Sequence, residues 1–356
     1  MQQQQLQQQQ QQNIQLPVPV KQLSKRQLMD ETYVDRLVFE KEPNNLLRDG
    51  QLVGYEQEVR IRTQVSVNGG RNFVYMVDRL NKPTIILMID VIRGQLSLYT
   101  NDLVRFTSYV NLTDWTRGLL VDHIDSLPIP LDDTVYPFNY NGLRRHMDIK
   151  TPFLVFSSLS IVEYDIIEQV LKRQGLVVDE SQYIFDMLTM TLDELRGKLP
   201  QLKAMVEGNE GQIQEEEAGI IDSYWAYRSA VSMEFMRWTT KHSLTSCKRV
   251  GVDMVSWIIQ YSDGSIGNLF TPSEHRKRGY AKSVVADLLI RMLEKGDAQP
   301  YLYIKTDNTE SQALFRSLGF HATNLARWLE VSAAPVPLPI VDSSPVALTQ
   351  QDNLQP

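Results

Sequence analysis

The fold is decided by residues 269–292, which read LFTPSEHRKRGYAKSVVADLLIRM. The first residues end an apolar run, and three consecutive basic side chains stand in the polar loop that follows. From Ala281 the apolar residues recur at i, i+3, i+4, i+7, i+8 and i+11, which places them on one face of a helix. We therefore predict a strand, a basic loop and an amphipathic helix that ends at Gly296.

This order of strand, basic loop, glycine and helix suits a pyrophosphate ligand. Free backbone N–H groups and the helix dipole attract anions to the start of a helix. Gly279 carries no Cβ, so the backbone can approach a ligand there. Arg276, Lys277 and Arg278 add positive potential, although a basic loop before a helix is also common on a solvated surface.

The neighbouring segments predict a mixed α/β sheet in the order β-β-α-β-α-β. The turn and cap signals that bound these segments are Ser262-Asp263-Gly264 for a hairpin and Thr309 with Gln312 for a capping box. The predicted elements are strands over 254–261 and 265–271, the helix from 281, a strand over 301–305, a short helix over 309–318 that stops at Gly319, and closing strands near 320 and over 328–331.

The central loop resembles the coenzyme A loop of the GNAT acetyltransferases. The residues that carry this resemblance are Arg276-x-x-Gly279-x-Ala281, placed after a strand and at the start of an amphipathic helix. Downstream, Asn308, the run 313–315 and the pair 319–320 are similar in order and spacing to the next strand and helix of that superfamily.

The match to glycine N-acyltransferase and its relatives is closer. It is carried by Asp222 to Trp225, Val255-Ser256-Trp257, Gly264, Thr271-Pro272-x-Glu274-His275-Arg276 and Trp328, and thinly in the first half by 98–101 and Trp115. The resemblance implies a GNAT-like mixed sheet in the C-terminal domain and a related or degenerate α/β domain before it. The first half has no glycine loop of its own, so we assign it no cofactor.

The resemblance implies an N-acyltransferase that moves an acyl group from acyl-CoA to the amine of glycine or another small amine. It implies an intracellular protein, mitochondrial as in the family, with a cytoplasmic location as the alternative. The residues expected to contact coenzyme A are Leu269, Phe270, Thr271, Arg276, Lys277, Arg278, Gly279, Tyr280, Ala281, Asn308 and Phe315.

Acyl transfer to an amine needs a base, because ordinary amines are protonated at pH 7. It also needs a donor for the tetrahedral oxyanion, which we expect to be a main-chain N–H near 269–271. The family places a glutamate after the hairpin glycine, where this chain has Ser265, and many GNAT enzymes place a tyrosine acid where it has Phe315. Glu274 and His275, or Asp263, could act as bases through water, and an ordinary surface role is the alternative for each.

These two departures leave other functions open. The chain could be a catalytically weak or inactive CoA-binding relative of the family. It could also be an unrelated scaffold whose basic loop binds another phosphate ligand. Neither the acyl chain nor the oligomeric state follows from the sequence.

Composition argues against several function classes. The net charge of -7 argues against a general nucleic-acid binder, which needs a basic face. A single cysteine, Cys247, excludes both a disulfide framework and a cysteine-based zinc site, and the histidines show no ligand spacing. No apolar run reaches the roughly 18 residues of a membrane span, and we predict no metal site.

The chain divides into five predicted parts. They are a disordered Gln-rich tail over 1–25, an N-terminal α/β domain over 26–206, an acidic linker over 207–217, the GNAT-like domain over 218–331 and a disordered Pro-rich tail over 332–356.

Overall fold

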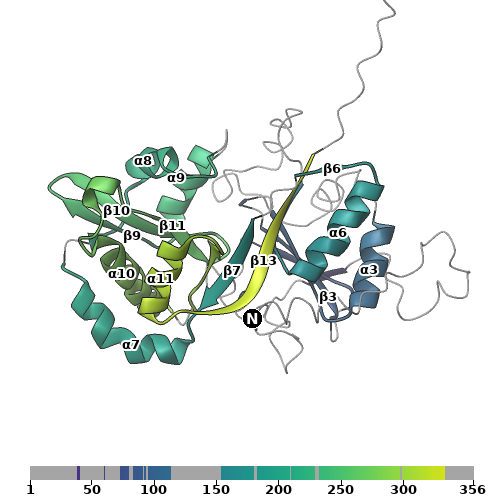
Figure 1. The fold of residues 1–356 in the computed structure, drawn as a ribbon, viewed down its shortest axis with the longest axis horizontal. Coiled ribbons are helices and arrows are strands. Elements are labelled where there is room, and N and C mark those ends of the chain that lie inside the picture. The colour runs from purple at the N-terminus through teal and green to yellow at the C-terminus, as the bar shows by residue number, and fades with distance from the viewer. Residues whose placement is uncertain are drawn as a thin grey trace, which may run out of the picture.

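The computed structural model describes residues 38–40, 60, 73–79, 83–90, 92–93, 95–113, 154–179, 183–208, 210–228, 232–296 and 299–332. The predicted Gln-rich tail and the Pro-rich tail beyond 332 lie outside these residues. The described strands form two sheets with helices against them (Figure 1), so the predicted α/β class is confirmed.

The larger sheet has the order β1-β2-β3-β4-β5-β13-β7-β12, and β6 pairs with β13 beside this path. Its strands are β1 (Val38–Glu40), β2 (Phe73–Val77), β3 (Ile85–Asp90), β4 (Gln95–Thr100), β5 (Leu154–Leu159), β6 (Val177–Val178), β7 (Ile184–Thr189), β12 (Tyr301–Lys305) and β13 (His321–Ser332). The smaller sheet has the order β11-β10-β9-β8, with β8 (Glu210–Gly211), β9 (Thr245–Val250), β10 (Asp253–Gln260) and β11 (Ile266–Phe270).

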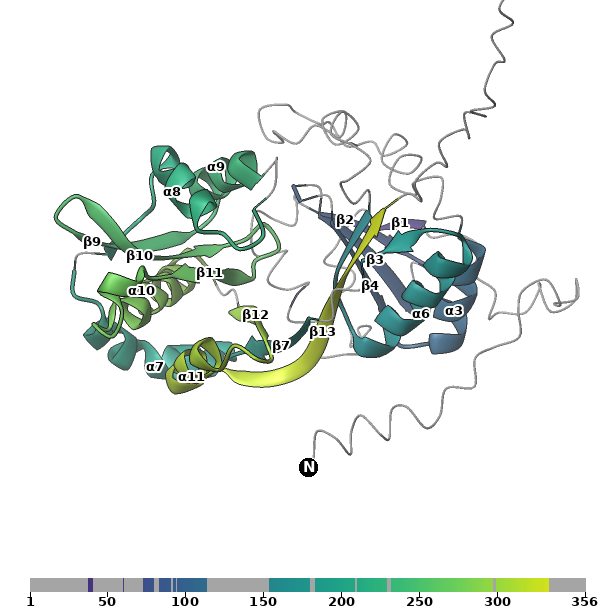
Figure 2. The ribbon, with the colours of Figure 1, turned by 45° about the horizontal axis from the view of Figure 1, so that its top comes forward.

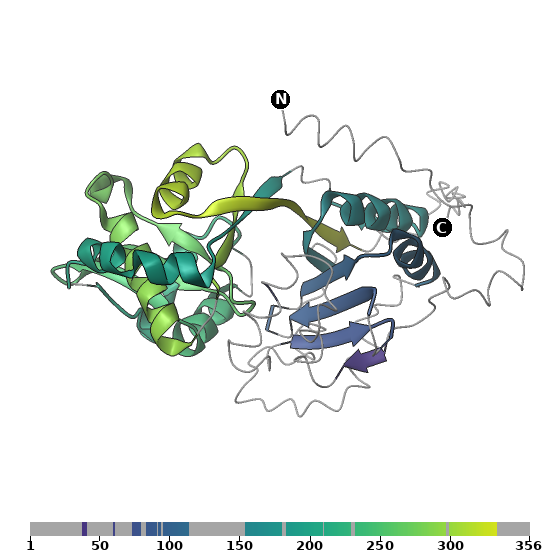
Figure 3. The ribbon, with the colours of Figure 1, turned by 90° about the horizontal axis from the view of Figure 1, so that it is seen from below.

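Seven described α-helices accompany the sheets. They are α3 (Leu103–Leu112), α6 (Ile161–Arg173), α7 (Leu192–Met205), α8 (Ala218–Ser223), α9 (Ser232–His242), α10 (Tyr280–Lys295) and α11 (Thr309–Leu318). In Figure 2, α8 and α9 cover one face of the smaller sheet and α10 lies on the other. Helices α3 and α6 pack on one face of the larger sheet (Figure 3), around a core that includes Phe106, Phe156 and Ile167.

The two halves of the chain repeat one order of elements. In the first half the antiparallel strands β2, β3 and β4 are followed by α3, the strand β5 and α6. In the second half β9, β10 and β11 are antiparallel and are followed by α10, β12 and α11. This repetition confirms the expectation of a related α/β domain in the N-terminal half.

Strand β13 joins the two halves. Residues 321–327 of β13 pair with β7, and residues 327–331 pair with β5 of the N-terminal half. Figure 3 shows this strand, in yellow, running from one half into the other. Strand β7 in turn lies between β13 and β12, although it precedes the predicted linker in sequence. Strands from both predicted domains therefore share one sheet, and the predicted boundaries themselves stay a prediction.

The helix ends follow the sequence signals closely, with one correction. Helix α6 begins at a capping box of Ser160 and Glu163, and α10 ends at Gly296 as predicted. The capping box expected from Thr309 and Gln312 is wrong. The N-cap of α11 is Asn308, whose side chain accepts from the Ser311 N–H, because the Gln312 amide is buried and donates to Asp186 at 2.6 Å.

The acidic segment 207–217 contributes structure of its own. It contains strand β8 and a short 3-10 turn at Glu215–Glu217. Lys248, on β9, is 2% exposed, and its Nζ lies 2.7 Å from Glu207 and 3.1 Å from Glu210. A buried ammonium needs such partners, which is why these carboxylates are held against the sheet. Strand β9 itself was not expected from the sequence.

We predict that Leu329→Ala destabilises both halves together. Leu329 lies on β13, is fully buried and belongs to the N-terminal core, so truncation should cost about 2–5 kcal/mol of unfolding free energy. Hydrogen exchange should rise in β4 and in β10 alike. The control is Val252→Ala, at a side chain that is 91% exposed. Faster exchange confined to one half would contradict the joining role of β13.

Candidate functional site

The two sheets are not joined by hydrogen bonds between β11 and β12. The two strands contact each other but belong to different sheets, each as the edge strand. At the corresponding place in the N-terminal half, β4 and β5 pair in parallel through Gln95 with Val155 and Leu96 with Phe156. Helix α10 therefore connects two edge strands, β11 and β12. On the edges where these strands face each other, their main-chain groups are not hydrogen-bonded to another described strand. Such edges can pair with an extended ligand.

A bulge at the end of β11 contributes to this interruption. Trp257 faces Phe270, but two residues further on Ile259 faces Gly267, so β11 holds one extra residue. Asn268 lies in this stretch with a φ of 51°, which is the left-handed region. A bulge bends its strand and turns main-chain groups out of the ladder. The predicted oxyanion donors at 269–271 follow directly after it.

The start of α10 is open. Its N-cap is Gly279, with a φ of 85°, and no side chain caps the helix. Gly279 is exposed, and a Cβ built there would meet no atom within 4 Å. The first N–H groups of α10 thus have no side-chain cap, and their contact with an anion stays a prediction.

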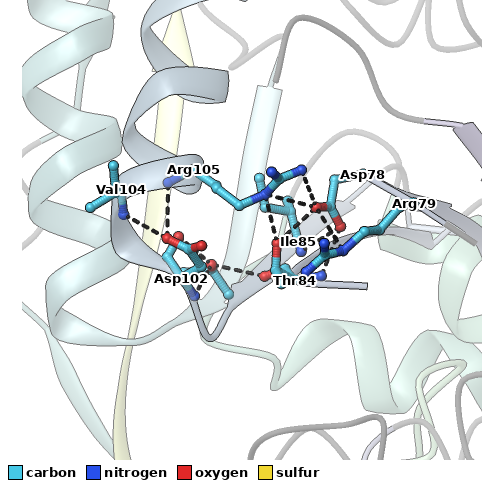
Figure 4. A network of polar contacts seen from close by, with 8 residues as sticks. Asp78, Arg79, Thr84, Ile85, Asp102, Val104 and Arg105 are labelled. Carbon is cyan, nitrogen blue, oxygen red and sulfur yellow. Dashed lines mark hydrogen bonds and ion pairs between the residues drawn. The ribbon is translucent and has the colours of Figure 1, made fainter. Parts of the chain in front are cut away.

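The start of α3 is closed by the protein itself. The Asp102 side chain accepts hydrogen bonds from the N–H groups of Val104 and Arg105, each at 3.1 Å (Figure 4). A carboxylate of the chain therefore occupies the place that an anionic ligand would take at α3. The two repeated halves therefore differ at the helix start: a side chain caps α3, and none caps α10.

Arg105 is tied to a second carboxylate beside Asp102. Its Nη2 lies 2.9 Å from Asp78 Oδ2, which also accepts from the Thr84 hydroxyl at 2.7 Å (Figure 4). Burial alone would raise the pKa of Asp78. The Ile85 N–H, the hydroxyl and N–H of Thr84, and the Arg105 guanidinium together hold that pKa below its ordinary value. The basic side chain nearest the start of α3 is thus already neutralised.

The basic loop before α10 is held by side-chain contacts to Thr271, and its three basic residues are exposed. Arg276, Lys277 and Arg278 are all exposed. The Nε of Arg276 donates to the carbonyl of Thr271 at 2.9 Å, and the Thr271 hydroxyl lies 2.8 Å from that of Ser256. These contacts fix the loop where it leaves β11. The proposed anion site lies at the other end of the loop, next to Gly279.

The remaining predicted coenzyme A residues fall into two groups. Leu269 and Phe270 end β11, and Tyr280 and Ala281 form the first turn of α10, so these surround the open helix start. Asn308 and Phe315 lie on α11. The Asn308 side chain caps that helix, and Phe315 is 3% exposed and packs on Phe320 with ring centroids 5.4 Å apart. Their contact with a ligand stays a prediction.

The predicted bases differ in their surroundings. Glu274 is exposed, and its own main-chain N–H and the Ser273 hydroxyl lower its pKa, which makes it a weaker base. His275 has a buried Nδ1 without a hydrogen-bond partner among the described residues. Ser265 is buried and donates to Asp263 Oδ1 at 2.6 Å, so its hydroxyl proton is already engaged.

Sequence analysis missed the groups that the N-terminal half brings to this site. Asp90, at the end of β3, accepts from the Ser262 hydroxyl at 2.7 Å, and Arg93 Nη1 lies 3.8 Å from Asp263 Oδ2. Burial, the largest influence, raises the pKa of Asp90 to about 6. Asp90 and Ser262 are 172 positions apart, so no local pattern predicts their contact. The local sequence shows only a carboxylate at the end of an apolar run.

Three further observations concern other parts of the described structure. Burial raises the pKa of the Cys247 thiol to about 11, so it stays a protonated, unreactive core group. No group of three or more His, Cys, Asp or Glu side chains among the described residues is placed to hold a metal ion. In the same part of the chain, no helix has the length and apolar character needed to cross a membrane.

The comparisons with known proteins place this geometry in a family context. Residues 246–329 match the FR47-like protein family. That match covers the basic loop and α10. No curated protein matches the chain. The narrower resemblance to glycine N-acyltransferases is therefore carried by the sequence alone.

Several solved structures are similar to this chain at low sequence identity. A Drosophila protein is 11% identical, with 84% of this chain and 98% of that chain covered and a TM-score of 0.57. A GCN5-related N-acetyltransferase-like protein from Streptococcus suis is 14% identical over 82% of this chain and 99% of its own, with a TM-score of 0.44. A tandem GNAT protein from the clavulanic acid biosynthesis pathway is 11% identical. The match covers 85% of this chain and 99% of that chain, with a TM-score of 0.44.

We predict that Asp90→Asn changes how stability depends on pH. The pKa of Asp90 rises from its ordinary 3.8 to about 6 on folding, so the folded state holds this proton more tightly than the unfolded state. The resulting contribution to the free energy of unfolding is fully present below about pH 4 and is lost as the pH rises to 6. Relative to the wild type, the variant should therefore gain up to about 3 kcal/mol of unfolding free energy between pH 4 and pH 7. Urea unfolding at several pH values measures this. Parallel profiles would contradict the raised pKa.

Proposed function

We propose that the protein is an acyl-CoA-dependent N-acyltransferase that transfers an acyl group to the amine of glycine or another small amine. The observation that carries this proposal is the uncapped start of α10 at Gly279, next to three exposed basic side chains. The FR47-like match over 246–329 supports it, because the match contains this loop. The mitochondrial location implied by the family resemblance stays a prediction.

In this proposal the diphosphate of coenzyme A lies on the N–H groups of the first turn of α10. The amide-containing arm then extends along the free edge of β11, where the bulge near Asn268 turns main-chain groups outward. The thioester comes to lie between β11 and β12. Among the described residues, the C-terminal half alone offers this path, because Asp102 caps α3 and β4 pairs with β5.

The reaction forms a C–N bond and breaks the C–S bond of the thioester. The neutral amine attacks the carbonyl carbon, and a main-chain N–H near 269–271 stabilises the oxyanion. The intermediate then collapses, and the sulfur leaves as a thiolate, since a thiol pKa near 8.5 requires little help from an acid. The proton of the amine passes to a base through water, and His275, Asp263 and Glu274 are the candidates.

We predict that Gly279→Glu weakens acyl-CoA binding at least about tenfold. A carboxylate at this position competes for the N–H groups of α10 and repels the diphosphate, and tenfold corresponds to 1.4 kcal/mol. Isothermal titration calorimetry with acetyl-CoA and with free CoA measures the dissociation constants.

The matched control for this variant is Gly175→Glu. Gly175 has a φ of 81°, a Cβ there would also meet no atom within 4 Å, and it follows α6 in the N-terminal half. The control therefore introduces the same charge and the same backbone strain away from the site. Equal affinity in Gly279→Glu and the wild type would remove the proposed diphosphate site.

A second candidate function is a CoA-binding protein without turnover. It is favoured by Ser265, whose hydroxyl is bound to Asp263 and cannot serve as a base near neutral pH. Release of free thiol from acetyl-CoA, with and without a panel of amino acids, distinguishes the two. We expect amine-dependent release that His275→Ala lowers about 100-fold if His275 is the base. Tight CoA binding without any amine-dependent release would support the second candidate instead.

A further inference from the structure

The turn between β3 and β4 of the N-terminal half packs into the C-terminal half. Ile92, in this turn, is 1% exposed and belongs to a core cluster with Phe235 of α9 and Trp257 of β10. The Asp90 carboxylate closes the turn, because it accepts from the N–H groups of Ile92 and Arg93 at 2.9 and 3.1 Å. A side chain of one half thus completes the core of the other.

Arg93 connects this turn to the turn that leads into β11. Its Nη1 lies 3.8 Å from Asp263 Oδ2, and its guanidinium carbon lies 5.2 Å from the ring centroid of Tyr261 and 5.6 Å from that of Phe235. A guanidinium over aromatic rings keeps a defined orientation. The other oxygen of Asp263 accepts from the Ser265 N–H at 3.0 Å, so this carboxylate closes the β10–β11 turn. The position of that turn therefore depends on a side chain of the N-terminal half.

Tyr301 connects the same turn to β12. It is the first residue of β12 and is fully buried, and its hydroxyl donates to the main-chain carbonyl of Asp263 at 2.6 Å. In the N-terminal half the corresponding strands β4 and β5 are joined by main-chain pairing. Among the described strands β11 and β12 have no such pairing, and the tyrosine side chain spans the distance instead. The β10–β11 turn is therefore held from two sides, by β12 and by the N-terminal half.

We propose that Arg93 and Tyr301 are positioning residues, which hold the β10–β11 turn and thereby set the gap between β11 and β12 for acyl transfer. This inference rests on the proposed function. The proposed thioester lies in that gap and the proposed oxyanion donors are at 269–271, so a shift of the turn moves the donors relative to the thioester. A displacement of about 1 Å can lower a rate roughly 100-fold. The diphosphate site at α10 does not include these contacts, so acyl-CoA affinity should not change.

The test compares turnover with binding in the full-length protein. Turnover is amine-dependent thiol release at saturating acetyl-CoA with a panel of amino acids, and binding is the dissociation constant of acetyl-CoA from calorimetry. We expect Arg93→Gln and Tyr301→Phe each to lower turnover about 10-fold to 100-fold and to leave the dissociation constant unchanged. Arg93→Lys keeps the charge and should retain more turnover than Arg93→Gln. The Tyr301 hydroxyl bonds to the main chain, so a loss of rate in Tyr301→Phe does not come from a lost base.

The matched control is Arg105→Gln. The Arg105 side chain is 12% exposed, against 15% for Arg93, and it is also paired with an aspartate of its surroundings. It contacts Thr84, at the other end of β3 from Asp90, so it does not touch the β10–β11 turn. This variant should lower the melting temperature and leave turnover unchanged. Should Arg93→Gln fail to fold, Arg93→Lys and the nearly isosteric Tyr301→Phe replace it in the comparison.

Failure of the proposed function gives a different result, because then the wild type releases no thiol with any amine. Hydrogen exchange tests the two residues in that case as well. A loosened turn should raise exchange at 266–270 of β11 more than at 154–159 of β5, whereas general destabilisation raises both alike. Three results would overturn the inference: unchanged turnover in either variant, turnover that falls only in proportion to acetyl-CoA affinity, or exchange that rises equally in the two strands.

Discussion

Main-chain N–H groups at the start of a helix need a partner, and the chain satisfies this constraint differently in its two halves. At α3 the Asp102 carboxylate accepts from the first N–H groups, and a second carboxylate neutralises Arg105. At α10 the N-cap is a glycine, the flanking basic residues are in solvent, and the N–H groups are left for a ligand. The start of α3 is thus closed by the chain itself, while the start of α10 has no side-chain cap and is the anion site that we propose.

The pairing of β13 with strands of both halves makes the N-terminal half part of the structure on which the C-terminal half depends. Strand β13 begins in the C-terminal half and completes the N-terminal core, where Leu329 and Val331 are buried. Strand β7 fills the place that β13 would otherwise take next to β12. The same arrangement brings Asp90 against the turn before β11. Both halves therefore contribute to the surroundings of the proposed site, although we propose that one half alone holds the diphosphate.

Local periodicity predicted most of the C-terminal half, because the apolar face of α10 and the turn residues around it are encoded within a few positions. The order of strands and helices and the end of α10 at Gly296 followed from such signals. What failed depended on distant partners. The capping box at Thr309 was wrong because Gln312 bonds to Asp186, and the contacts of Arg93 and Asp90 join positions far apart in the chain. No short-range pattern carries that information.

Hydrogen exchange of the full-length protein, with and without saturating coenzyme A, tests the central claim most directly. The uncapped N–H groups of residues 280–282, at the start of α10, should exchange more slowly once the diphosphate accepts from them. Those of 103–105, at the start of α3, should not change, since Asp102 already caps that helix. Protection at α3, or none at α10, would contradict the account.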